Sequence, residues 1–267
     1  MSCNHDCKSC SSKCGKQDLM FENSEPNKIK KIIAVVSGKG GVGKSTVTSM
    51  LAIEMAKKGY KVGILDADIT GPSIPKAFGI TADVAGDDKM MYPPTSKLGI
   101  KIMSINLLID DPRKPVLWRG PVLGNILKQF YQNVLWEDLD YLFLDMPPGT
   151  GDVQLTVFQS YPVDGVVIVS TPQDLVSMIV GKAVNMCKQM DIPIYGLVEN
   201  MSYIECPGCG EKLYPFGLSK LEEIANEYEL EPLCALPIDP TFNELVDMGA
   251  VENYDTSIIS NAVEKLL

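Results

Sequence analysis

The sequence contains a single histidine, His5, in a chain of 267 residues, and it lies close to the N-terminus. A Ser-His-Asp triad needs a histidine inside the folded domain. An HExxH zinc site, or an iron site of two histidines and a carboxylate, needs two histidines. These catalytic classes are therefore nearly excluded. If the chain is an enzyme, its chemistry rests on carboxylates, lysines, backbone amides, cysteines or a bound metal.

The sequence also lacks an apolar run of the roughly 20 residues that span a bilayer. Its 24 lysine and arginine residues against 34 aspartate and glutamate residues give a formal net charge of −10. A surface this acidic repels phosphate backbones and anionic lipids, so we expect neither nucleic acid nor a membrane as partner. The first sixteen residues are polar and cysteine-rich, without the apolar core of a signal peptide, which predicts a cytoplasmic protein.

Short apolar runs alternate with longer helical patterns after residue 30. The runs read as strands buried on both faces and cover residues 31–37, 61–68, 141–147, 164–171 and 194–201, with a further strand expected within 99–109. Helical patterns, the first of them amphipathic, cover 46–59, 122–133, 174–190, 218–229 and 255–267. This order predicts an α/β fold with a mainly parallel sheet and helices on both faces. We expect one domain over residues 31–267, after a flexible cysteine-rich tail over residues 1–30.

A glycine-rich segment follows the first predicted strand and opens the first predicted helix. Its sequence, GKGGVGKST, matches the P-loop pattern GxxxxGK[ST] in the structural context which that pattern requires. Glycines let successive backbone N–H groups turn towards an anion, and the helix N-terminus adds its dipole. Lys44 is expected to reach the β- and γ-phosphates, and Ser45 to bind Mg²⁺. The predicted nucleotide-binding residues of the loop are Gly38, Lys39, Gly40, Gly41, Val42, Gly43, Lys44, Ser45 and Thr46.

Lys39 gives this loop a second lysine, which the general P-loop pattern does not require. One interpretation is that Lys39 points away from its own nucleotide and supplies charge to the phosphates of a partner, in the manner of an arginine finger. The other is a solvated loop lysine.

Three aspartates end predicted strands near the loop, at Asp66, Asp68 and Asp145. The carboxyl ends of parallel strands meet at one edge of a sheet, so these carboxylates are expected to face the phosphates. Asp145 fits a Walker B role, holding the Mg²⁺ shell through its waters, and Asp66 supports that shell. Asp68 lies beyond its strand and is the better candidate to orient the attacking water. With both loop lysines, Asp68 and Asp145 form the predicted catalytic set for an ATP hydrolysis that is slow because mobile loops position it.

Cys206 and Cys209 form the pair CPGC. A zinc ribbon would need a second pair about 15–20 residues further on, and none follows. A redox pair opening a helix is another alternative, although Pro207 and the neighbouring glycines indicate a loop. Two thiolates do not complete a four-coordinate site within one chain. A two-fold dimer could supply four, for an iron–sulfur cluster or for zinc.

Four further cysteines lie within the first 14 residues and together suffice for a metal without a partner. An iron–sulfur cluster, zinc and a bare redox-sensitive tail all remain open for Cys3, Cys7, Cys10 and Cys14. Cys187 and Cys234 stand alone in an apparent helix and an apparent strand, where we predict that they pack in the core.

The loop with two lysines resembles the deviant Walker A group, which contains MinD, ParA, the arsenite-pump ATPase and the nitrogenase iron protein. More narrowly, GKGGVGKST, DADITGPSIP, DMPPGTGD, VENMSY and CPGCG occur in the order seen in the Mrp/ApbC iron–sulfur cluster carrier ATPases, from about Lys31 to Leu267. The resemblance implies a homodimer with ATP at each P-loop, Lys39 as the signature lysine, and a bridging [4Fe-4S] cluster on Cys206 and Cys209. The family passes such clusters to apo-proteins.

The same resemblance implies where the adenine base binds. Asn200 matches the position that contacts the base in such ATPases, and Pro237 and Asp239 match a loop near it. The N-terminal cysteines resemble those of eukaryotic cytosolic relatives, which carry a second cluster, but their spacing is tighter.

Three other functions fit parts of the pattern. A positioning ATPase of the MinD or ParA type would need a basic C-terminal helix or DNA-binding face, whereas residues 251–267 contain one lysine and three acidic residues. An electron-transfer reductase like the nitrogenase iron protein has cluster ligands far apart in sequence. The remaining alternative is a P-loop ATPase with structural zinc at its cysteines, which iron and sulfide analysis distinguishes.

Overall fold

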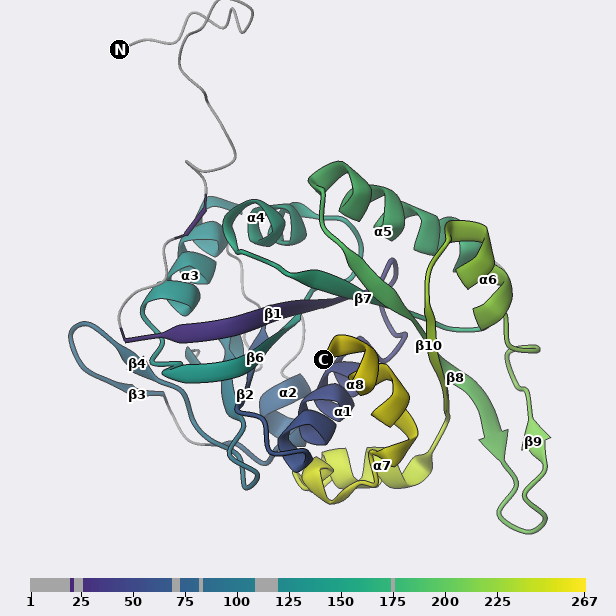
Figure 1. Ribbon diagram of the computed structural model, residues 1–267. Helices are drawn as coiled ribbons and strands as arrows, with labels where there is room; N and C mark the ends of the chain where they lie inside the picture. Colours follow the sequence, from purple (N-terminus) through teal and green to yellow (C-terminus); the bar gives the residue numbers. More distant parts are fainter. Residues whose placement is uncertain (1–19, 22–25, 69–72, 82–83, 109–119, 174–175) are drawn as a thin grey trace, which may run out of the picture.

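The computed structural model describes residues 20–21, 26–68, 73–81, 84–108, 120–173 and 176–267. In this part of the chain a mainly parallel sheet lies between two layers of helices (Figure 1). In spatial order its strands are β10 (Pro232–Pro237), β8 (Ile194–Glu205), β7 (Gly165–Ser170), β1 (Lys28–Val36), β6 (Asp138–Asp145), β2 (Val62–Asp66) and β5 (Lys101–Ser104). The short β9 (Lys212–Leu213) pairs antiparallel with the end of β8, and β3 (Ala85–Gly86) pairs with β4 (Met91–Tyr92) in a separate sheet.

Each face of the sheet carries its own hydrophobic cluster. One face is covered by α3 (Gly120–Gln132), α4 (Asp152–Ser160), α5 (Val176–Met190) and α6 (Leu221–Tyr228), and the other by α1 (Lys44–Lys57), α2 (Ser73–Ala77), α7 (Pro240–Asp247) and α8 (Ser260–Leu266) (Figure 1). Successive residues of β1 alternate between the two clusters, as a strand requires. Because both faces are buried, the central stretches of β1, β6, β7 and β2 are apolar, and the predicted parallel α/β fold is confirmed.

The parallel register brings three strand ends together at one edge of the sheet. β6 lies between β1 and β2, and Asp145 at its end is level with Val35 of β1 and with Asp66 of β2. The P-loop leaves β1 at the same edge. The sheet topology therefore gathers the predicted phosphate-binding and acidic residues before any side-chain contact is considered.

Three predicted boundaries or patterns differ from the structure. β1 begins at Lys28, which pairs with Asp138 of β6, three residues ahead of the strand predicted from residue 31. The predicted amphipathic helix is wrong in character: α1 is buried on most sides, since the sheet covers one side and α2 and α8 cover others. The further strand expected within 99–109 is confirmed as β5, and a 3₁₀ turn, Ile105–Leu108, follows it. The predicted helix 255–267 is a 3₁₀ turn, Ser257–Ile259, followed by α8.

The four N-terminal cysteines at positions 3, 7, 10 and 14 lie outside the described residues. Within the described part of the chain, no helix has both the length and the apolar character needed to cross a membrane.

Candidate functional site

The P-loop joins β1 to α1 and borders a cavity of about 280 Å³ at the carboxyl edge of the sheet. Gly41 and Gly43 both have φ of 78°, in the left-handed region that favours glycine. A side chain at Gly43 would also collide with the amide of Asn200. The cavity is lined by Ser37, Gly40, Gly41, Val42, Gly43, Lys44, Ser45, Thr46, Asp68, Ser73 and Pro148. Of the predicted loop residues, only Gly38 and Lys39 are absent from this lining.

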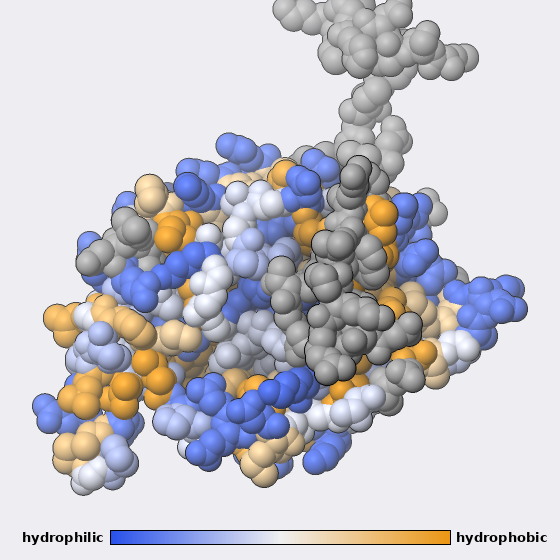
Figure 2. All heavy atoms as spheres, turned by 180° about the vertical axis from the view of Figure 1, so that it is seen from behind, coloured by the Kyte–Doolittle hydropathy of each residue, from blue (hydrophilic) through white to orange (hydrophobic). Residues whose placement is uncertain are grey.

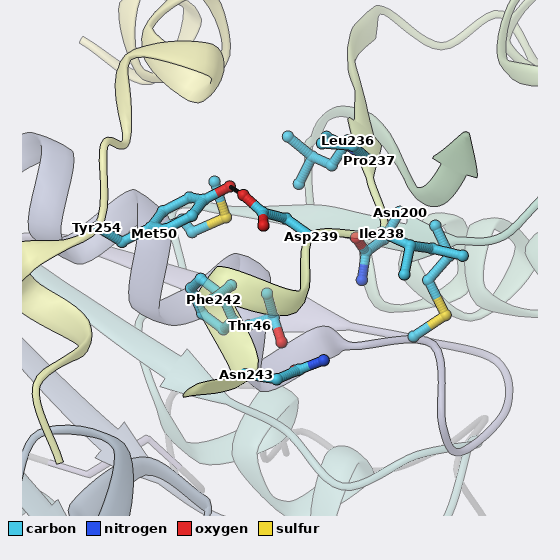
Figure 3. Close-up of a pocket in the computed structure, with 11 residues that line it drawn as sticks. Thr46, Met50, Asn200, Leu236, Pro237, Ile238, Asp239, Phe242, Asn243 and Tyr254 are labelled. Carbon is cyan, nitrogen blue, oxygen red and sulfur yellow. Dashed lines mark hydrogen bonds between the residues drawn. The ribbon is translucent and has the colours of Figure 1, made fainter. Parts of the chain in front are cut away.

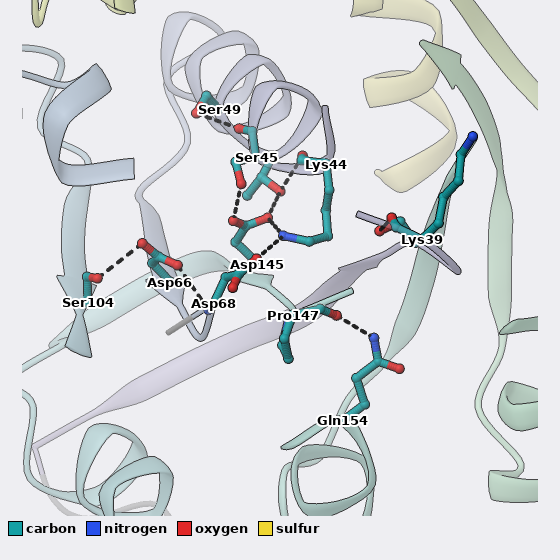
Figure 4. A network of polar contacts seen from close by, with 12 residues as sticks. Lys39, Lys44, Ser45, Ser49, Asp66, Asp68, Ser104, Asp145, Pro147 and Gln154 are labelled. Atoms are coloured by element: carbon teal, nitrogen blue, oxygen red, sulfur yellow. Dashed lines mark hydrogen bonds and ion pairs between the residues drawn. The ribbon is translucent and has the colours of Figure 1, made fainter. Parts of the chain in front are cut away.

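Asp145 is a fully buried carboxylate at the centre of the site (Figure 4). Its Oδ1 accepts hydrogen bonds from Nζ of Lys44 at 2.8 Å and from Oγ1 of Thr48 at 2.9 Å, and its Oδ2 accepts one from Oγ of Ser45 at 2.6 Å. All three donors come from the first turns of α1. The P-loop lysine is therefore held by Asp145, with Oδ2 of Asp68 at 3.8 Å from Nζ.

Asp66 is also fully buried, next to Asp145 in the adjacent strand. Oγ of Ser104 donates to one of its oxygens at 3.1 Å, and the backbone N–H of Asp68 donates to the other at 3.1 Å. Burial raises the pKa of Asp66 well above its ordinary value, and the charge of Asp145 raises it further, while Lys44 opposes both.

This donor set fits a divalent cation bound together with a nucleotide. The hydroxyl of Ser45 and the carboxylates of Asp66, Asp68 and Asp145 are the oxygen ligands that Mg²⁺ prefers. A cation there would also relieve the repulsion between Asp66 and Asp145, which the protein compensates only partly with Lys44. The structure thus brings together the three aspartates and two loop residues that the sequence assigned to this chemistry.

Lys39 is directed away from the other catalytic candidates (Figure 4). Its Nζ donates to Oε1 of Gln173, in the loop between β7 and α5, and the contact is exposed. Lys39 therefore does not face its own phosphate cavity in this structure.

A second, smaller pocket adjoins the P-loop cavity, and Thr46 lines both (Figure 3). Nδ2 of Asn200 donates to the backbone carbonyl of Val42 at 2.9 Å, which leaves its Oδ1 to accept from a ligand. The pocket contains the three predicted base-binding residues and is lined by Thr46, Met50, Asn200, Met201, Leu236, Pro237, Ile238, Asp239, Phe242, Asn243 and Tyr254.

Asp239 is fixed within this pocket by two hydrogen bonds. Its Oδ1 accepts the N–H of Thr241 at 2.8 Å as the N-cap of α7, and its Oδ2 accepts the hydroxyl of Tyr254 at 2.8 Å. Burial alone would raise the pKa of Asp239, but the hydrogen bonds from Tyr254 and Thr241 outweigh burial and lower it. The pocket therefore offers hydrogen-bond acceptors on a rigid support.

Cys206 and Cys209 lie in the loop that connects β8 to β9, in a hairpin at the end of the sheet (Figure 1). Cys206 is partly buried and Cys209 is exposed. Hydrogen bonds from the backbone N–H groups of Gly208 and Cys209, and a contact with the Cys209 side chain, lower the pKa of the Cys206 thiol. Across the described residues, no group of three or more histidine, cysteine, aspartate or glutamate side chains is arranged to hold a metal ion. The pair therefore has only two thiols to offer from one chain.

The two lone cysteines differ from this pair. Cys187 is fully buried in the core, as predicted, and burial raises its pKa to about 11. Cys234 is partly buried and packs against the other core cluster, where burial raises its pKa to about 12. In both positions burial disfavours the thiolate, and the surroundings are those of the hydrophobic core.

The sequence analysis missed three residues that support the site. Thr48 lies one helical turn after Lys44, so the helix period places it on the same face towards Asp145. Ser104 ends the strand next to Asp66, and Tyr254 anchors Asp239 from a segment close to the C-terminus. Helical spacing could have indicated Thr48, whereas Ser104 and Tyr254 depend on the strand order and the chain path.

Comparison with known families and proteins gives a consistent set of similarities. Residues 28–267 match the family described as ParA: NUBPL iron-transfer P-loop NTPase. The chain is 50% identical to an iron-sulfur cluster carrier protein of Clostridium perfringens, over 85% of this chain and 82% of the relative. It is 43% identical to the cytosolic Fe-S cluster assembly factor CFD1 of Kluyveromyces lactis, over 82% of this chain and 80% of the relative.

Solved structures give the same result for the fold. A nucleotide-binding protein from Archaeoglobus fulgidus, solved in complex with ADP, superimposes with a TM-score of 0.76 at 48% identity, covering 85% of this chain and 89% of the other. The MinC:MinD complex of Aquifex aeolicus contains a chain that superimposes with a TM-score of 0.64 at 21% identity, covering 88% and 95%, which supports the fold alone.

The raised pKa of Asp66 yields a testable consequence for stability. The folded chain binds this proton more tightly than the unfolded chain, so stability falls as pH rises above the ordinary carboxyl value of 3.8. Asp66→Asn removes the buried charge. We expect it to increase the free energy of unfolding at pH 7 by on the order of 1 kcal/mol, and to impair hydrolysis. Urea unfolding at pH 7 and near pH 3.5 measures the difference, which should vanish at the lower pH.

Asp87 provides a control of opposite sign. Hydrogen bonds from the Tyr92 hydroxyl and from the N–H groups of Lys89 and Met90 lower the pKa of Asp87 to about 2. Asp87→Asn should therefore reduce stability at pH 7, and the loss should shrink as pH falls from 3.8 towards 2. Destabilisation by Asp66→Asn at pH 7 would contradict the interpretation of Asp66 as a strained charge.

Proposed function

The chain belongs to the NUBPL iron-transfer P-loop NTPase family, and we propose that it is a homodimeric carrier that binds a [4Fe-4S] cluster and transfers it to apo-proteins, with slow ATP hydrolysis. The observation that carries this proposal is the presence in one domain of an intact P-loop centred on Asp145 and of an accessible cysteine pair. The carrier and assembly-factor names of relatives at 43–50% identity support it.

ATP binding would use the two adjoining pockets. The loop N–H groups and Lys44 receive the phosphates, so Lys44 exchanges its carboxylate partner for phosphate oxygens. Asn200, Pro237 and Asp239 surround the base, and the Oδ1 of Asn200 suits the exocyclic amine of adenine because its Nδ2 is already bonded to Val42. Bound Mg²⁺, held by Ser45 and the aspartate shell, supplies charge neutralisation for the phosphates.

Hydrolysis needs a group that orients water and positive charge that balances the developing phosphate charge. Asp68 is partly exposed and lines the phosphate cavity, which suits the first role. Lys44 supplies charge within the protomer, and Lys39 supplies it to the nucleotide of the partner. Loops on both sides of the cavity must close for this arrangement, which is why we expect slow turnover.

The cluster is cargo, and two protomers would hold it. Cys206 and Cys209 give two thiolates per chain, and a two-fold axis brings four together, the number that a [4Fe-4S] cluster requires. The lowered pKa of Cys206 favours the thiolate form that binds metal. Zinc also takes four thiolate ligands and is the second candidate for this site. The N-terminal cysteines are proposed to hold a second cluster, and recipients would be apo iron–sulfur proteins in the cytoplasm.

The β8–β9 hairpin that carries the cysteines and the loop directly after β9, here together called the hairpin, offer an apolar surface for the dimer. Four large side chains that follow Cys209 are exposed, by 51% at Leu213, 41% at Tyr214, 40% at Phe216 and 71% at Leu218. Apolar residues gather on the projecting hairpin at the left of Figure 2. Contact between two such hairpins would bury these residues and surround a shared cluster with apolar groups.

The first test concerns nucleotide hydrolysis. Lys44→Ala should reduce ATP turnover by roughly 100-fold or more, because the lysine is the principal charge on the phosphates. Lys44→Gln keeps a hydrogen-bond donor for Asp145 and separates loss of catalysis from loss of folding. Lys58→Ala, at the exposed end of the same helix, is the control. Near-normal turnover in the Lys44 variants would contradict the nucleotide assignment.

The second test measures iron and acid-labile sulfide on protein purified and reconstituted without oxygen. Wild type is expected to bind about four irons per bridged dimer, and the Cys206→Ala/Cys209→Ala double variant should lose that cluster. Deletion of residues 1–16 should retain the bridging cluster and most ATPase activity, and Cys187→Ala is a control in the core. Zinc in place of iron would contradict the carrier function and would indicate an ATPase with structural zinc.

The third test concerns the dimer surface. The double variant Phe216→Ser/Leu218→Ser should weaken dimerisation of the cluster-loaded protein at least tenfold, because each apolar side chain contributes about 1.5–3 kcal/mol when fully buried. Sedimentation equilibrium measures the dissociation constant. Met248→Ser removes an apolar side chain outside the hairpin, exposed by 76% against 71% for Leu218, and should have no effect. Unchanged dimerisation would exclude the hairpin as the contact.

A further inference from the structure

Among the residues that the structure describes, one side-chain acceptor holds Lys39 outside the phosphate cavity. Its Nζ donates to Oε1 of Gln173, and neither residue lines the cavity that Lys44 faces. Figure 4 shows the Lys39 side chain leaving the loop on the side opposite Lys44. The P-loop thus contains two lysines in opposite settings, one bound to the buried Asp145 and one bound at the surface by a neutral amide.

The sheet register explains why these two residues meet. β1 and β7 are parallel neighbours, and Val36 pairs with Ile168. Lys39 follows Val36 by three positions and Gln173 follows Ile168 by five, so both lie in loops that leave the same edge of the sheet. The turn before Gln173 contains Pro172 and is closed by the N–H of Gln173, which donates to the carbonyl of Thr171 at 2.9 Å. The amide is therefore presented by a constrained turn.

The backbone beside Lys39 is constrained as well. Oγ of Ser37 donates to the carbonyl of Lys39 at 2.9 Å. Gly38 packs so closely against Ile179 of α5 that a side chain at Gly38 would collide with it. The N–H of Gly149 donates to the carbonyl of Ser37 at 2.9 Å, which fastens this part of the loop to the segment after β6. Lys39 can therefore change partner by rotating its side chain while the loop stays in place.

We propose that Gln173 is a positioning residue for Lys39, a latch that holds the ammonium group in the isolated protomer and releases it to the phosphates of a second protomer. This inference rests on the proposed function, in which Lys39 acts in trans. A neutral amide is a weaker acceptor for an ammonium group than a phosphate oxygen is. The latch therefore opens against a partner's nucleotide and stays closed when no partner is present.

Substitutions at Gln173 test the latch through turnover. Gln173→Ala removes the acceptor and should raise kcat roughly three- to tenfold, the ratio that one exposed hydrogen bond supports. Gln173→Glu adds an ion pair and should lower kcat by a few-fold at low salt, with recovery towards wild type at high salt. KM for ATP should remain unchanged in both, because Gln173 does not line the nucleotide pockets. Matched controls are Gln189→Ala and Gln189→Glu, on the exposed far end of α5.

The same substitutions in a Lys39→Ala background complete the experiment. The latch predicts that they have no further effect there, because Gln173 acts only through Lys39. Equal effects in both backgrounds, a lower kcat in Gln173→Ala, or an effect of Gln173→Glu that salt does not relieve would each overturn the latch alone. Wild-type turnover in Lys39→Ala itself would overturn the trans role of Lys39 and the latch with it.

Discussion

The carboxylate of Asp145 is fully buried, and the arrangement of the site follows from the hydrogen-bond donors that surround it. An unpaired buried carboxylate costs several kcal/mol, and within the described part of the chain the three side-chain donors to Asp145 come from α1. The N-terminus of α1 is thereby held against the end of β6. Only a tight loop can connect β1 to a helix in that position, which accounts for the left-handed Gly41 and Gly43. The phosphate cradle is thus a consequence of neutralising one carboxylate.

The same compensation prepares the site for its ligands. Lys44 and Ser45 are bonded to Asp145 in this structure, and they are also the groups that a P-loop offers to phosphate and Mg²⁺. When phosphate and Mg²⁺ bind, Lys44 and Ser45 would exchange their contacts with Asp145 for contacts with the ligands. Asp66 is the exception, since its surroundings leave its charge undercompensated. A cation beside Asp66 would add positive charge to that of Lys44, which opposes the effects of burial and of Asp145.

Features set by residues close together in the sequence were predictable, and features set by contacts between distant segments were not. The P-loop and the three strand-end aspartates were predictable because short patterns and parallel-strand geometry determine them. The burial of α1 was not, because α8, some 200 residues later in the chain, covers its outer side. Ser104 and Gln173 likewise reach the site through strand order, which no local pattern encodes. The predicted roles of the site residues remain to be tested.

Strand β8 connects the two halves of the proposed function. Near its centre, Asn200 bonds to the P-loop and Met201 has φ of 57°, where the pairing with β10 shifts register. At its end the chain enters the cysteine loop, with Cys206 immediately after the last strand residue. An irregular residue inside a strand costs of order 1–3 kcal/mol and persists only where the surroundings impose it. Asn200 and Met201 line the pocket beside the P-loop, and Asn200 bonds to Val42, so the strand that leads to the cysteines is anchored to the P-loop.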